Sequence, residues 1–320
     1  MGRMQSFQEI QDTIFNFEEL LTKHGLTIDS NSELNKICIN ASTLQDVYSG
    51  KYSFDEYEEL PEYLSEAMGL YDFASKLLSI EKKHSFDSFV PHLDLLNKGS
   101  VPQNVRSKIT DSSSNKLFEL YLASLLIHIG EDIELDHPQN AKGDNPDILI
   151  TIKDRRWGFA CKAVHSPKEK SIFQNIEKAC KQIAASEAEV GIPVINMKNV
   201  IDHNALWPLL NESQVNSGEH PIWGTFFDAN DASKILQAYV LELREKYQTD
   251  EWATEFEILF ASKKNVLPAV VFVLQAGCSI LMDGQPFPSK LNVMSILPFG
   301  KLDGADSDVI HNLNEMMQNI

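Results

Sequence analysis

The sequence predicts an α/β protein in which helices flank a mixed β-sheet, preceded by a helical N-terminal region. Three observations support this fold class. Apolar residues recur with helical spacing through much of the first hundred residues, short apolar runs between residues 133 and 198 alternate with a long helical segment, and further strand-like runs follow near residues 269 and 291. With 320 residues, of which 43% are hydrophobic and 23% charged, the chain is long enough to bury a substantial core.

Residues 1–105 are expected to form the helical N-terminal region. Apolar side chains lie at helical spacing in the segments 7–24 and 63–80. The chain is acidic just before and at the start of the second segment, which predicts either a solvated helical face or a docking surface for a protein partner (Asp55, Glu56, Glu58, Glu59, Glu62 and Glu66). A polar stretch at 98–103 is expected to lead into a second domain, residues 106–300, and a C-terminal helical tail follows over 301–320.

The second domain is predicted to begin with the order helix, strand, strand, strand, helix, strand. Residues 111–115 are rich in helix-capping side chains, so a helix should run from about Asn115 to Ile129 and end at Gly130. Strands are expected at 133–135, 147–152 and 157–164, with a tight turn at 154–156 between the last two. The further elements expected are a helix over 171–188, a strand over 193–198, a helix over 231–247, strands near 269–275 and 291–297, and a final helix.

Cysteine usage and hydropathy exclude several classes of protein. The four cysteines are scattered, without a Cys-x-x-Cys pair or a clustered histidine, so we expect reduced thiols and neither a disulfide framework nor a zinc site (Cys38, Cys161, Cys180 and Cys278). The longest apolar stretch, residues 269–274, is too short to span a membrane, and the N-terminus has no apolar signal core. We therefore expect a cytoplasmic protein without a membrane partner.

Charge is unevenly distributed along the chain. The net charge of −18 would repel a polyanion such as nucleic acid. Between Lys153 and Lys181, however, eight basic residues stand against three acidic ones, which leaves this segment at +5. Such a local excess is typical of a footprint for phosphate, although a solvated hairpin and helix would show the same pattern.

The most informative residues lie inside and just before this basic segment. Pro146-Asp147 opens one predicted strand, Ala160-Cys161-Lys162 lies in the next, and Glu119 stands near the start of the preceding helix. Side chains alternate along a strand, so Ala160 and Lys162 share one face, while the odd-numbered residues 157–163 form an apolar face that should be buried. If the chain turns at about Arg155, Asp147 lies opposite residue 163, give or take one, and therefore close to Lys162.

In order and spacing, Pro146, Asp147 and Lys162 resemble the active-site signature of the PD-(D/E)xK nuclease superfamily, which reads Pro-Asp, a spacer, then acidic-any-Lys. The predicted elements over residues 111–200 are similar to the restriction-endonuclease-like core of that superfamily. The resemblance implies an endonuclease that cuts DNA with Mg²⁺, or with Mn²⁺, and members of this kind often serve in prokaryotic anti-phage defence. It implies that Asp147 and Lys162 are catalytic and that Asp147 and Glu119 hold the metal, with Asp144 as a second candidate ligand.

These residue types suit phosphodiester hydrolysis. A hard divalent ion on carboxylate oxygens offsets the phosphate charge and activates a water molecule, and a strand carbonyl can add another oxygen ligand. The lysine would orient the water and counter charge in the transition state. The alternative is an ordinary α/β domain, in which Asp147 follows a turn and Lys162 is a surface residue.

The chain departs from the signature at Ala160, where the acidic residue should stand. Three interpretations are open: the acidic side chain was replaced to silence a harmful nuclease, the carboxylate has moved to Asp144 or Glu119, or a natural nuclease-like protein binds without cutting. The first predicts an enzyme that is impaired as written. The third predicts a non-catalytic DNA- or protein-binding subunit of a larger complex, and the acidic N-terminal region would then be a partner surface or a gate that keeps DNA off the site.

The helix after the motif offers candidate substrate-binding residues. Gln174, Lys178, Lys181 and Gln182 form one helical stripe, and some superfamily members place a Gln or Lys on this helix near the phosphates. A solvated polar face would have the same pattern. His165, just past the strand, either touches phosphate or is simply exposed. Because cutting two DNA strands often takes two active sites, a homo-oligomer is a further expectation.

Overall fold

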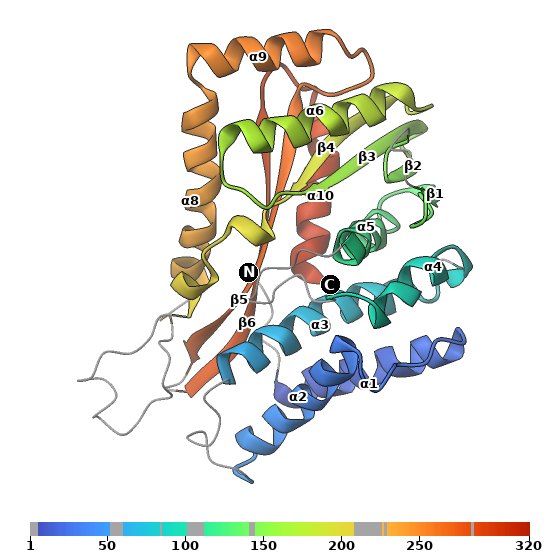
Figure 1. The fold of residues 1–320 in the computed structure, drawn as a ribbon, viewed down its shortest axis with the longest axis vertical. Coiled ribbons are helices and arrows are strands. Elements are labelled where there is room, and N and C mark those ends of the chain that lie inside the picture. Colours follow the sequence, from blue (N-terminus) through green and yellow to red (C-terminus); the bar gives the residue numbers. More distant parts are fainter. Residues whose placement is uncertain are drawn as a thin grey trace, which may run out of the picture.

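The computed structural model describes residues 6–51, 60–83, 85–100, 112–140, 145–207, 226, 229–282 and 285–320. It shows an α/β protein in which N-terminal helices precede a six-stranded mixed sheet with helices on both faces (Figure 1). This confirms the predicted class at that level. The core is continuous: buried apolar side chains form one cluster that extends from Ile10 in the first helix to Met317 in the last.

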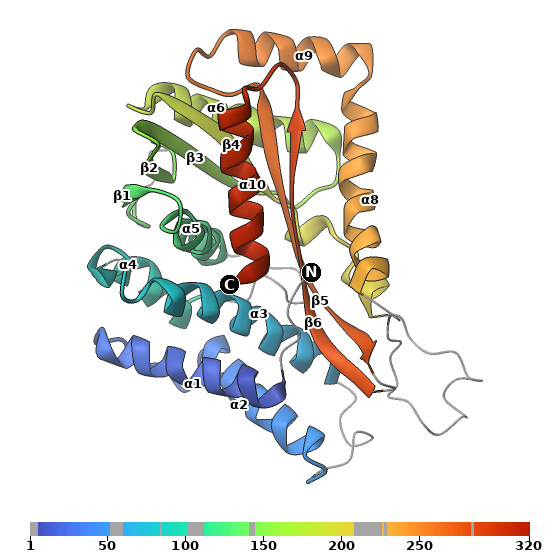
Figure 2. The ribbon, with the colours of Figure 1, turned by 180° about the vertical axis from the view of Figure 1, so that it is seen from behind.

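Three helices make up most of the N-terminal region: α1 (Phe7–Lys23), α2 (Glu33–Tyr48) and α3 (Leu60–Ile80). Ser6 starts α1 with a capping box, because its hydroxyl accepts from the Glu9 amide and the Glu9 carboxylate accepts from the Ser6 amide. Helix α2 was not among the predicted elements. Figures 1 and 2 show that α1 and α2 lie outside α3, which itself packs against the sheet and helix α5.

The acidic stretch of this region is only partly a surface feature. Residues 55–59 lie outside the described part of the chain. Glu66 contradicts the solvated-face interpretation: its side chain is buried and accepts from the Asn40 side-chain amide at 2.9 Å, which ties α3 to α2. Burial raises the pKa of its carboxyl group. In the described residues, no helix is long and apolar enough to cross a membrane.

The middle of the chain follows the predicted order of helix, three strands, helix and strand. Short helical turns lead into it, namely η2 (Phe86–Ser88), α4 (Val90–Leu93) and η3 (Asp94–Asn97). The elements themselves are α5 (Ser112–Leu126), β1 (Glu131–Leu135), β2 (Ile148–Ile152), β3 (Arg155–Ala163), α6 (Glu169–Ala185) and β4 (Val190–Asn196). The strands lie in the sheet in chain order, with β1, β2 and β3 antiparallel and β3 and β4 parallel.

The register of the β2–β3 hairpin differs from the prediction. The turn consists of Lys153 and Asp154, and both have positive φ angles, of 49° and 60°. A two-residue turn in which both residues have positive φ angles matches the twist of the flanking strands. Strand β3 therefore begins at Arg155, two residues before the predicted start at residue 157. Ile148 pairs with Phe159, and one further step along the ladder puts Asp147 opposite Ala160, not opposite residue 163.

Strand β3 is also more deeply buried than a one-sided strand would be. Trp157, Phe159 and Cys161 are buried, as predicted for their face, and Gly158 and Ala160 of the other face are buried as well. The reason is that helices cover both faces: α5 and α6 both pack against β3. In Figure 1, α6 lies in front of the sheet with α8, and in Figure 2, α10 lies in front of the opposite face.

The C-terminal part extends the sheet with a long hairpin. Strands β5 (Ala269–Met282) and β6 (Gln285–Pro298) are antiparallel partners over their whole lengths, and β5 runs parallel to β4. The sequence predicts only the first half of β5 and most of the second half of β6. Between β4 and this hairpin come η4 (Lys198–Val200), η5 (His203–Leu206), α8 (Ala229–Tyr247) and the unpredicted α9 (Asp250–Ala261), and α10 (Gly304–Asn319) follows it.

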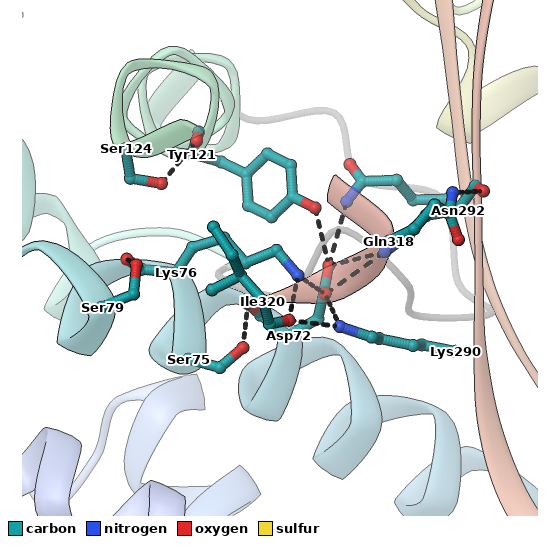
Figure 3. A network of polar contacts seen from close by, with 11 residues as sticks. Asp72, Ser75, Lys76, Ser79, Tyr121, Ser124, Lys290, Asn292, Gln318 and Ile320 are labelled. Carbon is teal, nitrogen blue, oxygen red and sulfur yellow. Dashed lines mark hydrogen bonds and ion pairs between the residues drawn. The ribbon is translucent and has the colours of Figure 1, made fainter. Parts of the chain in front are cut away.

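A buried polar network joins the N-terminal region to this hairpin (Figure 3). Asp72 of α3 is at its centre: one carboxylate oxygen accepts from Lys76 at 2.7 Å and Lys290 at 2.8 Å, and the other accepts from the Tyr121 hydroxyl at 2.9 Å. These four side chains come from α3, α5 and β6. The remaining contacts are made by side-chain amides and by a main-chain oxygen that both lysines reach (Gln275, Asn292 and Ile320).

Two glycines on neighbouring strands allow α6 to approach the sheet closely. Gly158 and Gly191 are paired between β3 and β4. A Cβ atom on Gly191 would lie 2.6 Å from the Gly158 carbonyl oxygen and 2.5 Å from the Ile183 side chain of α6. We therefore expect Gly191→Ala to lower the free energy of unfolding by about 3 kcal/mol through overpacking. Urea unfolding followed by circular dichroism measures this change.

Gly304 provides the matched control for that substitution. A Cβ atom there would meet nothing within 4 Å, and the residue opens helix α10. Gly304→Ala should therefore be neutral, or should stabilise the protein by up to about 1 kcal/mol because alanine favours the helix. Equal effects of the two substitutions would contradict the close approach of α6 to β4.

Candidate functional site

Three residues singled out by the sequence lie together at the end of the β2–β3 hairpin. Asp147 precedes β2, Lys162 lies near the end of β3, and Glu119 comes from the middle of α5. The Asp147 Oδ2 atom accepts from the Cys161 backbone amide at 2.6 Å and lies 3.4 Å from the Lys162 Nζ atom. The Lys162 ammonium also donates to the Cys161 carbonyl oxygen at 2.8 Å. The strand therefore holds the carboxylate and the lysine against each other.

A second lysine, Lys116, bridges the two carboxylates. Its Nζ atom is 2.9 Å from Glu119 Oε2 and 3.6 Å from Asp147 Oδ1. Lys116 and Glu119 are three residues apart on α5, a spacing that places them on the same side of a helix. The site thus contains two carboxylates and two ammonium groups. Lys116 was not among the predicted site residues, although its spacing from Glu119 was a usable signal.

A buried histidine closes the site on the side of the short helix α4. The His92 side chain is 1% exposed, and its Nε2 atom lies 4.0 Å from Glu119 Oε2. Neither ring nitrogen has a hydrogen-bond partner in the described residues. Burial lowers the pKa of this imidazole to about 3, and the nearby Lys116 ammonium adds to the shift. The ring is therefore neutral at physiological pH. No sequence pattern pointed to His92, which is far from the motif in the chain.

The electrostatics of the site reflect its burial. Burial raises the pKa of Glu119 well above its ordinary value, and the charge of Asp147 raises it further, against the opposite influence of Lys116. Burial by itself would lower the pKa of Lys116, but the Glu119 and Asp147 carboxylates together raise it. The Lys116 ammonium is thus held in its charged form by the two carboxylates that flank it.

Ala160 is fully buried in the middle of the sheet, opposite the position of Asp147 and paired with Pro193 on β4. An alanine supplies no oxygen to the site. Two groups of β3 contact Asp147, the Cys161 amide and the Lys162 side chain, and they belong to the two residues that follow Ala160. An acidic side chain at residue 160 would enter next to the Asp147 carboxylate.

The remaining candidates are less central. Gln174 and Lys178 are exposed on α6 and have no hydrogen bond or ion pair with Asp147, Glu119 or Lys162 in the described part of the chain. His165 is exposed, and its Nδ1 atom lies 3.0 Å from the Asn199 side-chain amide. Asp144 lies outside the described residues.

Gln182, from the same stripe of α6, is the member that reaches the loop before Asp147. Its Nε2 atom donates to the Asn145 carbonyl oxygen at 3.0 Å, and its buried Oε1 atom has no hydrogen-bond partner in the described residues. Since Asn145 is two residues before Asp147, this contact fixes the start of the Pro-Asp segment on α6.

The basic segment does not surround the site as its sequence suggests. Arg155 lies at the opposite end of β3 from Lys162, roughly 20 Å away at the rise of an extended strand. Arg155 and Arg156 are also neutralised by Asp306 and Glu134. Within the basic segment, the lysines that are exposed and have no carboxylate partner in the described residues lie at the hairpin turn or on and beside α6 (Lys153, Lys168, Lys170 and Lys178).

The donor set suits a hard cation with few protein ligands. Across the described residues, no group of three His, Cys, Asp or Glu side chains is arranged to hold a metal ion. The oxygens of Asp147, Glu119 and the Cys161 carbonyl nevertheless meet the preference of Mg²⁺ for one or two carboxylates, the other positions being filled by water and phosphate. The site therefore fits Mg²⁺ or Mn²⁺, which Asp147 and Glu119 would hold, whereas one imidazole beside Glu119, that of His92, falls short of the His and Cys ligand set of a typical zinc site.

Comparison with known proteins adds no relative: no family model, no curated protein and no solved structure matches the chain. What the site can do follows from its residue types and their geometry.

Proposed function

We propose that this protein is a metal-dependent endonuclease of the PD-(D/E)xK type, which hydrolyses DNA and is impaired as written by Ala160. The observation that carries the proposal is the contact of Asp147 with both Lys162 and the Cys161 amide, at the end of a strand, with Glu119 beside them. This arrangement supports the roles that the Pro-Asp and acidic-any-Lys signature implies. A role in prokaryotic anti-phage defence is part of the same proposal and rests on the resemblance alone.

Each residue has a role in this proposal. Asp147 and Glu119 bind the cation, which supplies charge neutralisation and an activated water when it is bound. Lys162 is held beside Asp147 by the Cys161 carbonyl, from where it can position the attacking water and oppose charge on the phosphate. Gln182 holds the loop that carries Asp147. Exposed lysines of α6, with Gln174, would contact the DNA backbone outside the site, and so would His165.

Restoring an acidic residue at position 160 tests the proposal. We expect Ala160→Glu to raise the rate of plasmid cleavage with Mg²⁺ at least about 100-fold above that of the Ala160 protein, because it adds the missing cation ligand. Ala160→Asp covers the case in which the buried position admits only the shorter side chain. Supercoiled plasmid conversion on agarose gels measures the rate, with EDTA as the metal-free reference.

Ala185→Glu is the control, because it adds the same charge at an exposed position near the end of α6. It should leave cleavage at the level of the Ala160 protein. If neither acidic variant at residue 160 cuts DNA, and neither binds Mn²⁺ in a titration, the proposal that this protein is a metal-dependent endonuclease is wrong.

A second candidate function is a nuclease-like subunit that binds DNA without cutting it. The observation that favours it is the charge balance of the site, in which the Lys116 and Lys162 ammonium groups already neutralise both carboxylates without a metal ion. This candidate requires salt-dependent DNA binding that weakens on Lys162→Ala, with no cleavage gained from Ala160→Glu. A DNA-binding titration at two salt concentrations therefore separates it from the enzyme.

A further inference from the structure

Each of the three groups that would hold a cation, the Asp147 and Glu119 carboxylates and the Cys161 carbonyl, is already in contact with a lysine. The Lys162 ammonium contacts Asp147 Oδ2 and the Cys161 carbonyl oxygen. The Lys116 ammonium contacts Asp147 Oδ1 and Glu119 Oε2. Lys162 belongs to the signature, but Lys116 is an addition. Its ammonium lies between the two carboxylates, in contact with the same oxygens that a bound cation would need.

An ammonium and a divalent cation compete for such a position. Both are attracted by the same pair of carboxylates, and they repel each other at the short distances that coordination imposes. The site is wrapped by buried groups, with His92 on one side and the strand on the other, so water screens this repulsion little. A cation that binds Asp147 and Glu119 together must therefore displace the Lys116 ammonium from at least one of them.

Lys116 is placed so that it can leave. Its side chain is 19% exposed, whereas Glu119 is buried, so the lysine reaches the carboxylates from the solvent side. Lys116 also lies in the first half of α5, next to the beginning of that helix at Ser112. A long, unbranched side chain in this position can turn outward and pair with an anion in front of the site, such as a DNA phosphate.

We propose that Lys116 is a resident counter-ion of this site, which occupies the cation position in the resting protein and must move away when Mg²⁺ or Mn²⁺ binds. The proposal rests on the function proposed above and adds a level of regulation to it. Without DNA, Lys116 keeps the affinity for cations low. A DNA phosphate gives the displaced ammonium a new partner, so DNA and the cation should strengthen each other's binding.

The test is a Mn²⁺ titration without DNA, in which electron paramagnetic resonance counts the free ion. It is carried out on the full chain with Ala160→Glu, alone and combined with Lys116→Met, which keeps an unbranched side chain of nearly the same length and a similar helix propensity but removes the charge. We expect Lys116→Met to tighten Mn²⁺ binding at least about 10-fold. Lys116→Arg, which keeps the charge, should leave the affinity low.

Lys23→Met is the matched control, because Lys23 is an exposed lysine of α1 whose loss changes the net charge of the protein equally. It should not change Mn²⁺ affinity. If Lys116→Met yields an unstable protein by circular dichroism, Lys116→Gln provides the same comparison with a polar side chain.

The outcomes separate the two proposals. If the Ala160→Glu protein binds Mn²⁺ and Lys116→Met leaves the affinity unchanged or weakens it, the counter-ion role is wrong while the cation site stands. If Ala160→Glu binds no Mn²⁺ with or without Lys116→Met, the cation site itself is wrong and the counter-ion role is overturned with it. A second titration with a non-cleaved phosphorothioate duplex should tighten Mn²⁺ binding with Lys116 present and have a smaller effect with Lys116→Met.

Discussion

Asp72→Asn is expected to lower the free energy of unfolding by about 3–5 kcal/mol, because it removes the carboxylate that two buried ammonium groups share. Lys76 is completely buried and Lys290 is 6% exposed, and both donate to the same Asp72 oxygen. Burial alone would raise the pKa of Asp72, but these two lysines hold it below its ordinary value. Burial lowers the pKa of Lys76 to about 8, against the attraction of Asp72.

An exposed pair provides the control for this prediction. Asp94 and Lys98 are also an Asp–Lys pair four residues apart, but both side chains are about half exposed. Asp94→Asn should therefore change stability by less than about 1 kcal/mol. Urea unfolding followed by circular dichroism and tryptophan fluorescence measures both variants. Equal losses for the two substitutions would contradict the assignment of a buried charge centre to Asp72.

The charge argument can be separated from a loss of shape by a compensated variant. Combining Asp72→Asn with Lys76→Met and Lys290→Met removes all three side-chain charges, so most of the penalty for unpaired buried ammonium groups should disappear. In the unmodified protein, the pKa of Asp72 is lower in the folded state than in the unfolded state. Its stabilising contribution is therefore present at neutral pH and is lost as the pH falls through the folded-state pKa.

The same network couples the N-terminal region to the candidate site. Tyr121, which donates to Asp72, is two residues from Glu119 on α5, and that helix is buried on all sides from Leu117 to Leu126. Helix α3 thus helps to fix the rotation of the helix that carries Glu119 and Lys116. Such coupling does not follow from hydrophobic periodicity, because Asp72 and Lys290 are distant in sequence and each would be taken for a surface residue.

The order of the elements could be predicted from the sequence because each has a local cause. Apolar periodicity defines α1, α5 and α6, a capping box marks the start of α1, and short apolar runs define β2, β3 and β4. The hairpin register could not be predicted, because it depends on Lys153 adopting a positive φ angle, which lysine rarely does. Helices α2 and α9 were missed because their apolar residues are interrupted by polar ones, and tertiary packing stabilises them.

The candidate site, too, could be predicted only in part from the sequence. Asp147 and Lys162 are on neighbouring strands, so strand pairing brings them together under either register. The sequence placed Glu119 on the correct helix without showing that it reaches Asp147, because helix-to-sheet packing is a tertiary property. Lys116 had a local signal in its spacing from Glu119, whereas His92 had none, since only the packing of α4 against α5 brings it to the site.

The second large effect concerns the division of roles between Asp147 and Lys162. In the Ala160→Glu background, Lys162→Met should reduce DNA cleavage at least about 100-fold while Mn²⁺ still binds, because the proposed function gives the lysine a role toward the water and the phosphate and none as a cation ligand. Asp147→Asn should abolish both cleavage and Mn²⁺ binding, because the Asp147 carboxylate is the group shared by both lysines and the proposed cation. Lys23→Met again controls for net charge and should leave both properties unchanged.

Two measurements on each variant, cleavage of supercoiled plasmid and Mn²⁺ binding, distinguish this division of roles from a purely structural one. If Asp147 served only to anchor the strand through the Cys161 amide, asparagine would keep that acceptor, and both properties would survive in Asp147→Asn. If Lys162 served only to neutralise Asp147, Lys162→Met would tighten Mn²⁺ binding and spare cleavage. Loss of cleavage with retained binding in one variant, and loss of both in the other, is the pattern that a catalytic lysine beside a cation-binding aspartate requires.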